Sequence, residues 1–155
     1  MELFSAALKH EEEIPKRYVR KEIGGENVSL PLNWEGAPDG TKSFALSIVD
    51  PHPVANNWIH WLVINIPPAV NAIEEGASGR SMPSGSVELQ NSFGASGYGG
   101  PQPPKGSGVH PYVVAIHALD VEKLDLDKRV SLDDFKEAIE GKTLEVASIT
   151  GYYSQ

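Results

Sequence analysis

Three apolar runs of strand length constrain the fold of this chain more than any other feature of its sequence. Ser43–Val49 alternates large apolar residues with small or polar ones and stops at Asp50-Pro51. Trp58–Ile66 is apolar on both faces, which suits a central strand covered on both sides. Tyr112–Leu119 is a third run, rich in β-branched residues. Strands separated by Gly/Pro turns predict a mainly antiparallel β fold, a sandwich or a barrel.

The remaining segments add shorter elements. Val28–Leu32 and Leu144–Tyr153 are further candidate strands. One helix is predicted over about residues 131–140, because Ser131 can cap it and Leu132, Phe135, Ala138 and Ile139 then share a face. The stretch Asp120–Arg129 mixes charges with scattered apolar residues, which indicates a solvated connection. A chain of 155 residues can bury one self-sufficient core, so we expect a single domain over 1–155.

Charge is distributed unevenly along the chain. Residues 41–118 contain only seven of the 34 charged residues, but nine of the 12 prolines, nine of the 15 glycines and four of the five histidines. A segment so poor in charge must form interior or a site, with loops that Pro stiffens and Gly tightens. The acidic excess lies in the flanks and says little about a ligand.

Composition excludes several classes of protein. The chain has no cysteine, so it can form no disulfide, thiolate metal site or thiol nucleophile. The net charge of −8 argues against nucleic-acid binding, which needs clustered Lys and Arg. The start of the chain has an acid at Glu2 and no basic region typical of a signal peptide, and no run reaches the roughly 20 apolar residues of a membrane span. We therefore expect a soluble, cytoplasmic protein with no integral membrane association.

Chemically versatile side chains gather at the ends of the predicted strands. Asp50 and His52 close one strand, His60 opens the next, and His110 with Tyr112 opens a third. Residues two apart on a strand project to one face, so His110 and Tyr112 can enter the same cavity. His117 lies an odd number of positions away and should face the other side. If the three strand ends meet, two imidazoles, a phenol and a carboxylate form a pocket suited to a small anion such as phosphate or a carboxylate.

Other chemistries have weaker support in the sequence. The histidines and Asp50 could ligate zinc or iron, but no His-x-x-x-His or Glu-x-x-His spacing anchors a site. No serine lies in a Gly-x-Ser-x-Gly motif, and Ser96 comes closest. Neither Gly97-Tyr98-Gly99 nor Gly106-Ser107-Gly108 completes a dinucleotide or P-loop fingerprint. We predict no metal and no cofactor.

The order and spacing of several motifs resemble one known family. The motifs are Asp50-Pro51 after a strand, WIHWLVIN at 58–65 and GYGGPQPPKGSGVHPY at 97–112. Supporting matches lie at Ile14-Pro15, at 38–46 and at 147–153. Together they resemble the phosphatidylethanolamine-binding protein (PEBP) family, also called Raf kinase inhibitor-like proteins, in its shorter bacterial and archaeal branch. The resemblance spans nearly the whole chain.

The resemblance carries expectations about fold and site. It implies a central antiparallel sheet packed on a smaller sheet, with an anion pocket at one edge. Family members bind phosphate-like groups, including phospholipid headgroups, and several act by binding protein kinases or peptidases. Homodimers are plausible for this branch. Carried over by motif, the pocket residues here are Asp50, His60, Pro104, His110 and Tyr112, with Gly100 and Pro101 shaping the adjoining loop.

The chain departs from the family pattern at three positions. His52 stands where the family usually has an acid, which adds a titratable base and makes His52 a further candidate ligand-binding residue. Pro111 replaces the usual Arg between the His and the Tyr, so a guanidinium and one backbone N–H are lost. Gln102 replaces the Cys before the paired prolines, and any role of that thiol is absent.

These observations favour a non-enzymatic binding protein with a small anion pocket. His60 and His110 would act as donors, Asp50 as orienter and Tyr112 as a hydroxyl partner for phosphate, acetate or a phosphatidylethanolamine-like headgroup. We expect binding to strengthen below about pH 6.5 as the imidazoles become charged. Two alternatives stay open. One is a protease or kinase inhibitor that acts through surface contacts independent of the pocket. The other is a hydrolase that uses a His/Asp pair, for which no nucleophile stands out.

Overall fold

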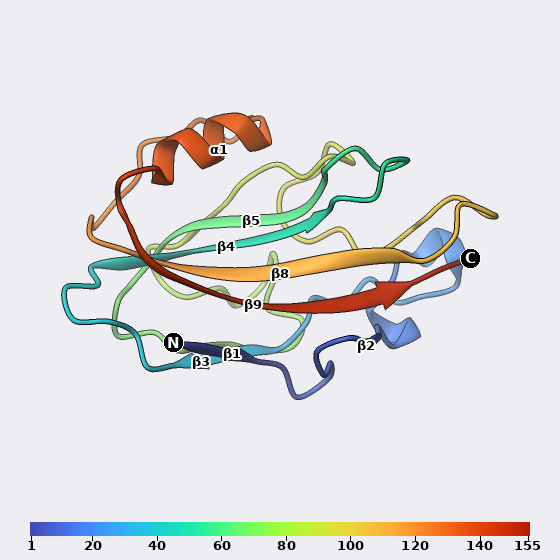
Figure 1. Cartoon of the computed structure of the whole chain (residues 1–155), viewed down its shortest axis with the longest axis horizontal. Helices are drawn as coiled ribbons and strands as arrows, with labels where there is room; N and C mark the ends of the chain where they lie inside the picture. Colours follow the sequence, from blue (N-terminus) through green and yellow to red (C-terminus); the bar gives the residue numbers. More distant parts are fainter.

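Two β-sheets and one α-helix make up the computed structural model, which describes all 155 residues (Figure 1). The large sheet has six strands in the order β2-β9-β8-β4-β5-β7, antiparallel except for the parallel pair β2 and β9. Its strands are β2 (Glu12–Glu13), β4 (Ser43–Asp50), β5 (Trp58–Ile66), β7 (Val87–Glu88), β8 (His110–Leu119) and β9 (Thr143–Tyr153). The predicted mainly antiparallel β fold is confirmed.

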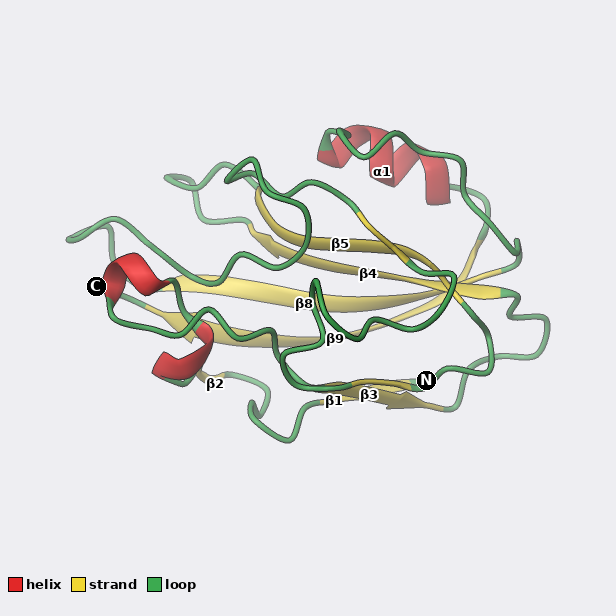
Figure 2. Ribbon diagram, turned by 180° about the vertical axis from the view of Figure 1, so that it is seen from behind, coloured by secondary structure: helices red, strands yellow, loops and turns green.

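A smaller sheet covers one face of the large one. It has three strands in the order β1-β3-β6, with bounds β1 (Glu2–Phe4), β3 (Leu32–Glu35) and β6 (Ala72–Ile73). The helix α1 (Leu132–Ile139) lies on the opposite face of the large sheet (Figure 2). Two short 3-10 helices, Lys16–Tyr18 and Lys21–Ile23, connect β2 to β3. None of the helices is long and apolar enough to cross a membrane.

The apolar residues of the long strands are buried on both sides of the large sheet. The main hydrophobic core lies between the two sheets and includes Trp34, Phe44 and Trp61, each at most 2% exposed. A second cluster lies under α1 and includes Leu62 and Phe135. Strand β5 therefore needs apolar residues on both faces, which explains its uninterrupted apolar run.

The bounds of the three long runs agree with the sequence to within two residues. β8 begins at His110, although Pro111 lacks the N–H that an internal strand needs. On one side of β8, pairing with β4 ends at Val113, which lies opposite Val49. On the other side, β9 extends further, and its Tyr152 lies opposite Pro111. The proline is tolerated because β8 has only one neighbour there.

Two short segments differ from their predictions. Val28–Leu32 is not a strand, and β3 begins only at Leu32. Pro31 has no N–H to donate to a ladder. The connection Asp120–Arg129 is not simply solvated, because Leu124 is 7% exposed and packs in the cluster under α1. Its backbone N–H donates to the side chain of Asn65 at 2.8 Å.

The helix begins as the sequence predicts. The Ser131 hydroxyl accepts from the backbone N–H of Asp134, and the Asp134 carboxylate accepts from the backbone N–H of Ser131. Asp134 therefore takes the third helical position of the capping box, where Glu or Gln is usual. Phe135 and Ile139 are the buried residues of the helix, and Glu140 is its C-cap residue.

Candidate functional site

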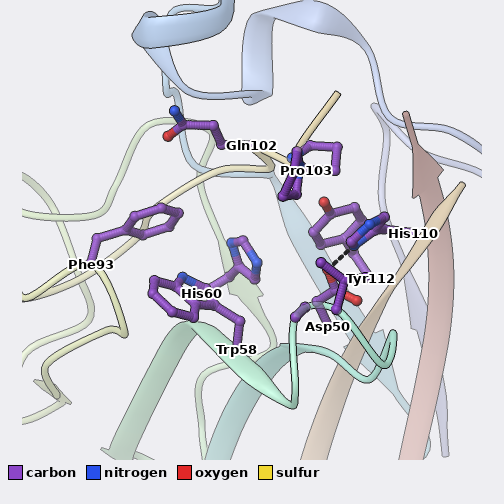
Figure 3. A pocket seen from close by; sticks show the side chains of 11 residues that line it. Asp50, Trp58, His60, Phe93, Gln102, Pro103, His110 and Tyr112 are labelled. Carbon is purple, nitrogen blue, oxygen red and sulfur yellow. Dashed lines mark hydrogen bonds and ion pairs between the residues drawn. The ribbon is translucent and has the colours of Figure 1, made fainter. Parts of the chain in front are cut away.

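The strand ends that carry the versatile side chains meet around one cavity of about 190 Å³ (Figure 3). Asp50 pairs directly with Trp58 across the β4–β5 hairpin, and His60 lies two residues further along β5. The start of β8 supplies His110 and Tyr112. The full lining is Asp50, Val54, Ala55, Trp58, His60, Phe93, Gln102, Pro103, Pro104, His110 and Tyr112. All five residues that the PEBP motifs assigned to the pocket lining are therefore in it.

Asp50 and His110 form a buried hydrogen-bonded pair in the lining of this cavity. Nδ1 of His110 lies 2.6 Å from Oδ2 of Asp50, and both side chains are almost inaccessible to solvent. The other carboxylate oxygen, Oδ1, accepts from the backbone N–H of His52 at 2.9 Å. Nε2 of His110 lies 2.8 Å from Oγ of Ser107. Both ring nitrogens of His110 therefore have protein partners, so His110 is not the free donor that the sequence suggested.

His60 presents a different hydrogen-bonding surface to the cavity. Its Nδ1–H donates to the carbonyl oxygen of Gly99 at 2.7 Å, and Nε2 has no partner in the protein. Burial lowers the pKa of His60 to about 4, although the bond to Gly99 and the charge of Asp50 oppose that shift. The expectation that His60 charges below about pH 6.5 is wrong. A neutral ring that donates from Nδ1 offers a lone pair at Nε2.

Tyr112 contributes a hydroxyl group. The side chain is 1% exposed, and its ring lies edge-on to His60 with centroids 5.0 Å apart. Burial raises the pKa of Tyr112, with smaller contributions from the charges of Asp50 and Tyr153. The phenol therefore keeps its proton at neutral pH and can donate it to a ligand. The Tyr112 hydroxyl makes no hydrogen bond within the protein. His60 and Tyr112 both line the cavity, as Figure 3 shows.

Gly100 and Pro101 shape the loop beside the cavity but do not line it. A Cβ at Gly100 would lie 2.1 Å from the carbonyl oxygen of Tyr18, so only glycine allows this close approach. The backbone N–H of Gly100 donates to the side chain of Asn27 at 2.7 Å. Pro101 is buried, and its carbonyl oxygen accepts from the backbone N–H of Arg20 at 3.1 Å.

His52 also lies outside the cavity lining. Its ring stacks on that of His110, with centroids 3.8 Å apart and planes 9° from parallel. Nδ1 of His52 accepts from the backbone N–H of Val54 at 3.0 Å, so that nitrogen carries no proton. His52 therefore supports the His110 ring. A direct role of His52 in ligand binding stays a prediction, and the cavity lining does not include this residue.

Two residues beside the cavity were not among the candidates. The guanidinium of Arg20 lies 3.9 Å from the centroid of Phe93, so a cation stands behind one wall. Arg20 lies in the charged N-terminal part of the chain, and its backbone hydrogen bond to Pro101 holds it beside the cavity. No local sequence pattern predicts this long-range contact. Ser107 was considered only as part of a Gly-Ser-Gly run. The sequence signal that could have linked Ser107 to His110 is their separation of only three residues.

The remaining histidine on β8 faces the other side of the sheet, as its odd offset predicts. Nε2 of His117 lies 3.0 Å from Oγ of Ser47, and its ring meets Phe135 of α1 edge-on. The side chains of the candidate cavity bring no three of His, Asp or Glu close enough together to hold a metal ion.

Comparison with known proteins agrees with this arrangement. The family model described as "Phosphatidylethanolamine-binding protein" matches residues 4–154. The chain belongs to the phosphatidylethanolamine-binding protein family. A UPF0098 protein of Methanothermobacter thermautotrophicus is 43% identical over 99% of this chain and 98% of its own length. The UPF0098 protein YbhB of Escherichia coli is 37% identical over 99% of this chain and all of its own length.

Solved structures of PEBP relatives have the same fold. YbcL of E. coli, described as a new member of the mammalian PEBP family, superposes with a TM-score of 0.92 at 34% identity. The match covers 99% of this chain and 98% of YbcL. The PEBP homolog CT736 of Chlamydia trachomatis gives a TM-score of 0.84 at 31% identity, over 99% and 97% of the two chains. The two-sheet architecture of this chain is thus that of the family.

Proposed function

We propose that this PEBP family member binds a small phosphate monoester or phospho-headgroup in the cavity between β4, β5 and β8. One observation carries the proposal: the Tyr112 hydroxyl and Nε2 of His60 are polar groups in buried side chains, they border the same cavity, and neither has a partner in the protein. Both residues line the cavity, so a ligand that enters it can reach these two groups. A ligand that pairs with both satisfies them.

The chemistry of the two groups selects the ligand. Tyr112 donates, whereas neutral His60 accepts at Nε2, so the ligand needs both an acceptor oxygen and an acidic hydroxyl. A singly protonated phosphate monoester has both. Arg20 behind Phe93 adds no net charge to this set, because its guanidinium is paired with the Glu22 carboxylate at 3.1 Å. This set favours a monoanion over a dianion, which offers His60 no proton.

The carboxylate of Asp50 does not prevent anion binding. Its two oxygens are engaged by the His110 ring and by the backbone N–H of His52. The wall that faces it is aromatic, because Trp58 and Phe93 line the cavity with their rings edge-on, 5.4 Å apart. That wall can contact the organic part of a phospho-headgroup, including an ammonium group.

The expected affinity is modest and depends on pH. Each hydrogen bond to a charged ligand contributes about 1.5–3 kcal/mol. After the cost of association, two or three such bonds give a Kd of roughly micromolar to millimolar. The second pKa of a phosphate monoester is about 6, so binding strengthens as the pH falls through that value. The cause is protonation of the ligand and not of His60.

NMR titration with O-phosphoethanolamine tests the proposal. We expect Kd to fall severalfold between about pH 7.5 and about pH 5.5, as the monoester takes up its proton. Tyr112→Phe should weaken binding by about tenfold, the value of one hydrogen bond. His117→Gln is the matched control, because it changes an imidazole of the same strand on the opposite face. Binding that is indifferent to Tyr112→Phe, or that strengthens as the pH rises, overturns the proposal.

A further inference from the structure

Three side chains near the cavity form a continuous hydrogen-bonded series. Oγ of Ser107 lies 2.8 Å from Nε2 of His110, and Nδ1 of the same ring lies 2.6 Å from Oδ2 of Asp50. A hydroxyl, an imidazole and a carboxylate in this order are the arrangement of nucleophile, base and orienting acid in serine hydrolases of unrelated folds. The sequence order, Asp before Ser before His, is no obstacle, since such sites are identified by geometry.

We propose that Ser107 is the nucleophile of an acyl-transfer site that cleaves small carboxylic esters, with His110 as its base. This activity goes beyond the proposed binding function and uses a different atom. The sequence offered a His/Asp hydrolase as an alternative but no nucleophile for it. The tertiary structure places Ser107 next to the buried Asp50–His110 pair.

The base is held firmly in place. His110 is fully buried, and Asp50 is fixed by the backbone N–H of His52 as well as by the ring itself. The His52 ring stacks on His110 at 3.8 Å and limits rotation of the imidazole. With Nδ1–H donated to Asp50, the lone pair of Nε2 points to the Ser107 hydroxyl. Asp50 also stabilises the imidazolium that forms when His110 takes the proton.

The nucleophile stands on an accessible loop. Gly106 and Gly108 flank Ser107, both with positive φ, and a Cβ at either would meet no atom within 4 Å. The Ser107 hydroxyl donates to the carbonyl oxygen of Pro104 at 2.6 Å, and it must turn towards Nε2 of His110, 2.8 Å away, before its proton can pass to that base. The backbone N–H groups of Gly108 and Val109 donate to no protein acceptor. They are free to bind an oxyanion next to the nucleophile.

The reaction balances without a further reactant other than water. Oγ of Ser107 attacks the ester carbonyl carbon while its proton passes to Nε2 of His110. The tetrahedral intermediate collapses, the C–O bond to the alcohol breaks, and the alcohol leaves with the proton from His110. Water then attacks the Ser107 ester by the same route and releases the carboxylic acid.

The cavity limits the substrate class. Pro104 and His110, the two residues that Ser107 contacts, line the 190 Å³ cavity, so one part of the ester can lie against its aromatic wall. A cavity of this size accepts a short acyl or alcohol group and not a long chain. The substrate class is therefore a small ester with a compact apolar end.

Incubation with p-nitrophenyl acetate, followed by mass spectrometry of tryptic peptides, tests the proposal. We expect one acetyl group on Ser107, with release of p-nitrophenolate. Ser107→Ala should lose this acetylation, and Asp50→Asn and His110→Gln should each slow it by about 10²-fold or more. Ser96→Ala is the matched control, since Ser96 lies in another Gly-rich loop and bonds only to a backbone carbonyl. It should react like the wild type.

A second variant separates chemistry from loop structure. The chain has no cysteine, so Ser107→Cys introduces a unique thiol that should be acylated in place of the hydroxyl. Ser107→Ala should still bind O-phosphoethanolamine, which shows that the loop is intact. Absence of acetyl from Ser107 in folded wild-type protein, or equal nitrophenolate release by Ser107→Ala, refutes the inference. Either result leaves the Tyr112-dependent binding test unaffected, so the two proposals fail separately.

Discussion

Two buried histidines should make the folded protein lose stability as the pH falls from about 7 to about 4.5. Burial lowers the pKa of His60 and of His117 to about 4 in the folded state, whereas an unfolded histidine titrates near 6.5. Between these values the unfolded chain binds more protons than the folded one, so acid favours unfolding. The stabilisation is complete above about pH 6.5 and is lost progressively as the pH falls towards about 4.

The magnitude follows from the two pKa values. At about pH 4.5 the difference in protonation free energy between the folded and unfolded states is roughly 2–3 kcal/mol for each histidine. Both together lower the free energy of unfolding by about 5 kcal/mol, a large share of the total for a domain of this size. Carboxylates contribute as well, so the histidine term is best isolated by comparing variants.

Urea unfolding at a series of pH values provides the assay. His117→Gln removes one titrating group on the face away from the cavity, where Gln can still bond to Ser47. Its free energy of unfolding should fall by roughly 2–3 kcal/mol less than that of the wild type between about pH 7 and about pH 4.5. His10→Gln, at the surface, controls for the loss of an imidazole. Parallel pH profiles for the wild type and both variants would refute the burial argument.

Two further predictions concern Gly100 and Leu124, whose packing contacts only the structure shows. Gly100→Ala should lower the free energy of unfolding by about 2–3 kcal/mol, because its Cβ would meet the Tyr18 carbonyl oxygen at 2.1 Å. Urea unfolding measures this, and an unchanged value would show that the loop can move away. Leu124→Ala should cost about 2–3 kcal/mol, because Leu124 is part of the core under α1. Thermal unfolding checks this, and a cost below about 0.5 kcal/mol, typical of surface sites, would contradict it.

Local patterns predicted much of the fold. Alternation and apolar runs located β4, β5 and β8, and Ser131 with Gly141 bounded α1. The patterns failed at Val28–Leu32, where an apolar segment is held by core packing without a strand ladder. A residue such as Leu30 is buried in either case, so hydrophobicity alone cannot separate the two conformations.

Part of the site was also predictable from sequence. Four pocket residues lie at or beside strand ends: Asp50, His60, His110 and Tyr112. Antiparallel pairing brings such ends together at one edge. Pro104 is predicted only by the family motif. The order and spacing of the PEBP family motifs assign these residues to one pocket. Roles in ligand binding, a protein partner and a dimer stay predictions.

The three long strands, the side chains at their ends and the resemblance to the PEBP family could all be read from the amino-acid sequence. Those properties depend on periodicity and on residue type over short spans. The folded chain was needed to show that burial lowers the pKa of His60, that His52 stacks on His110, and that Ser107 contacts the same ring. Burial and hydrogen-bond partners set those properties, and both arise from contacts between segments far apart in the chain.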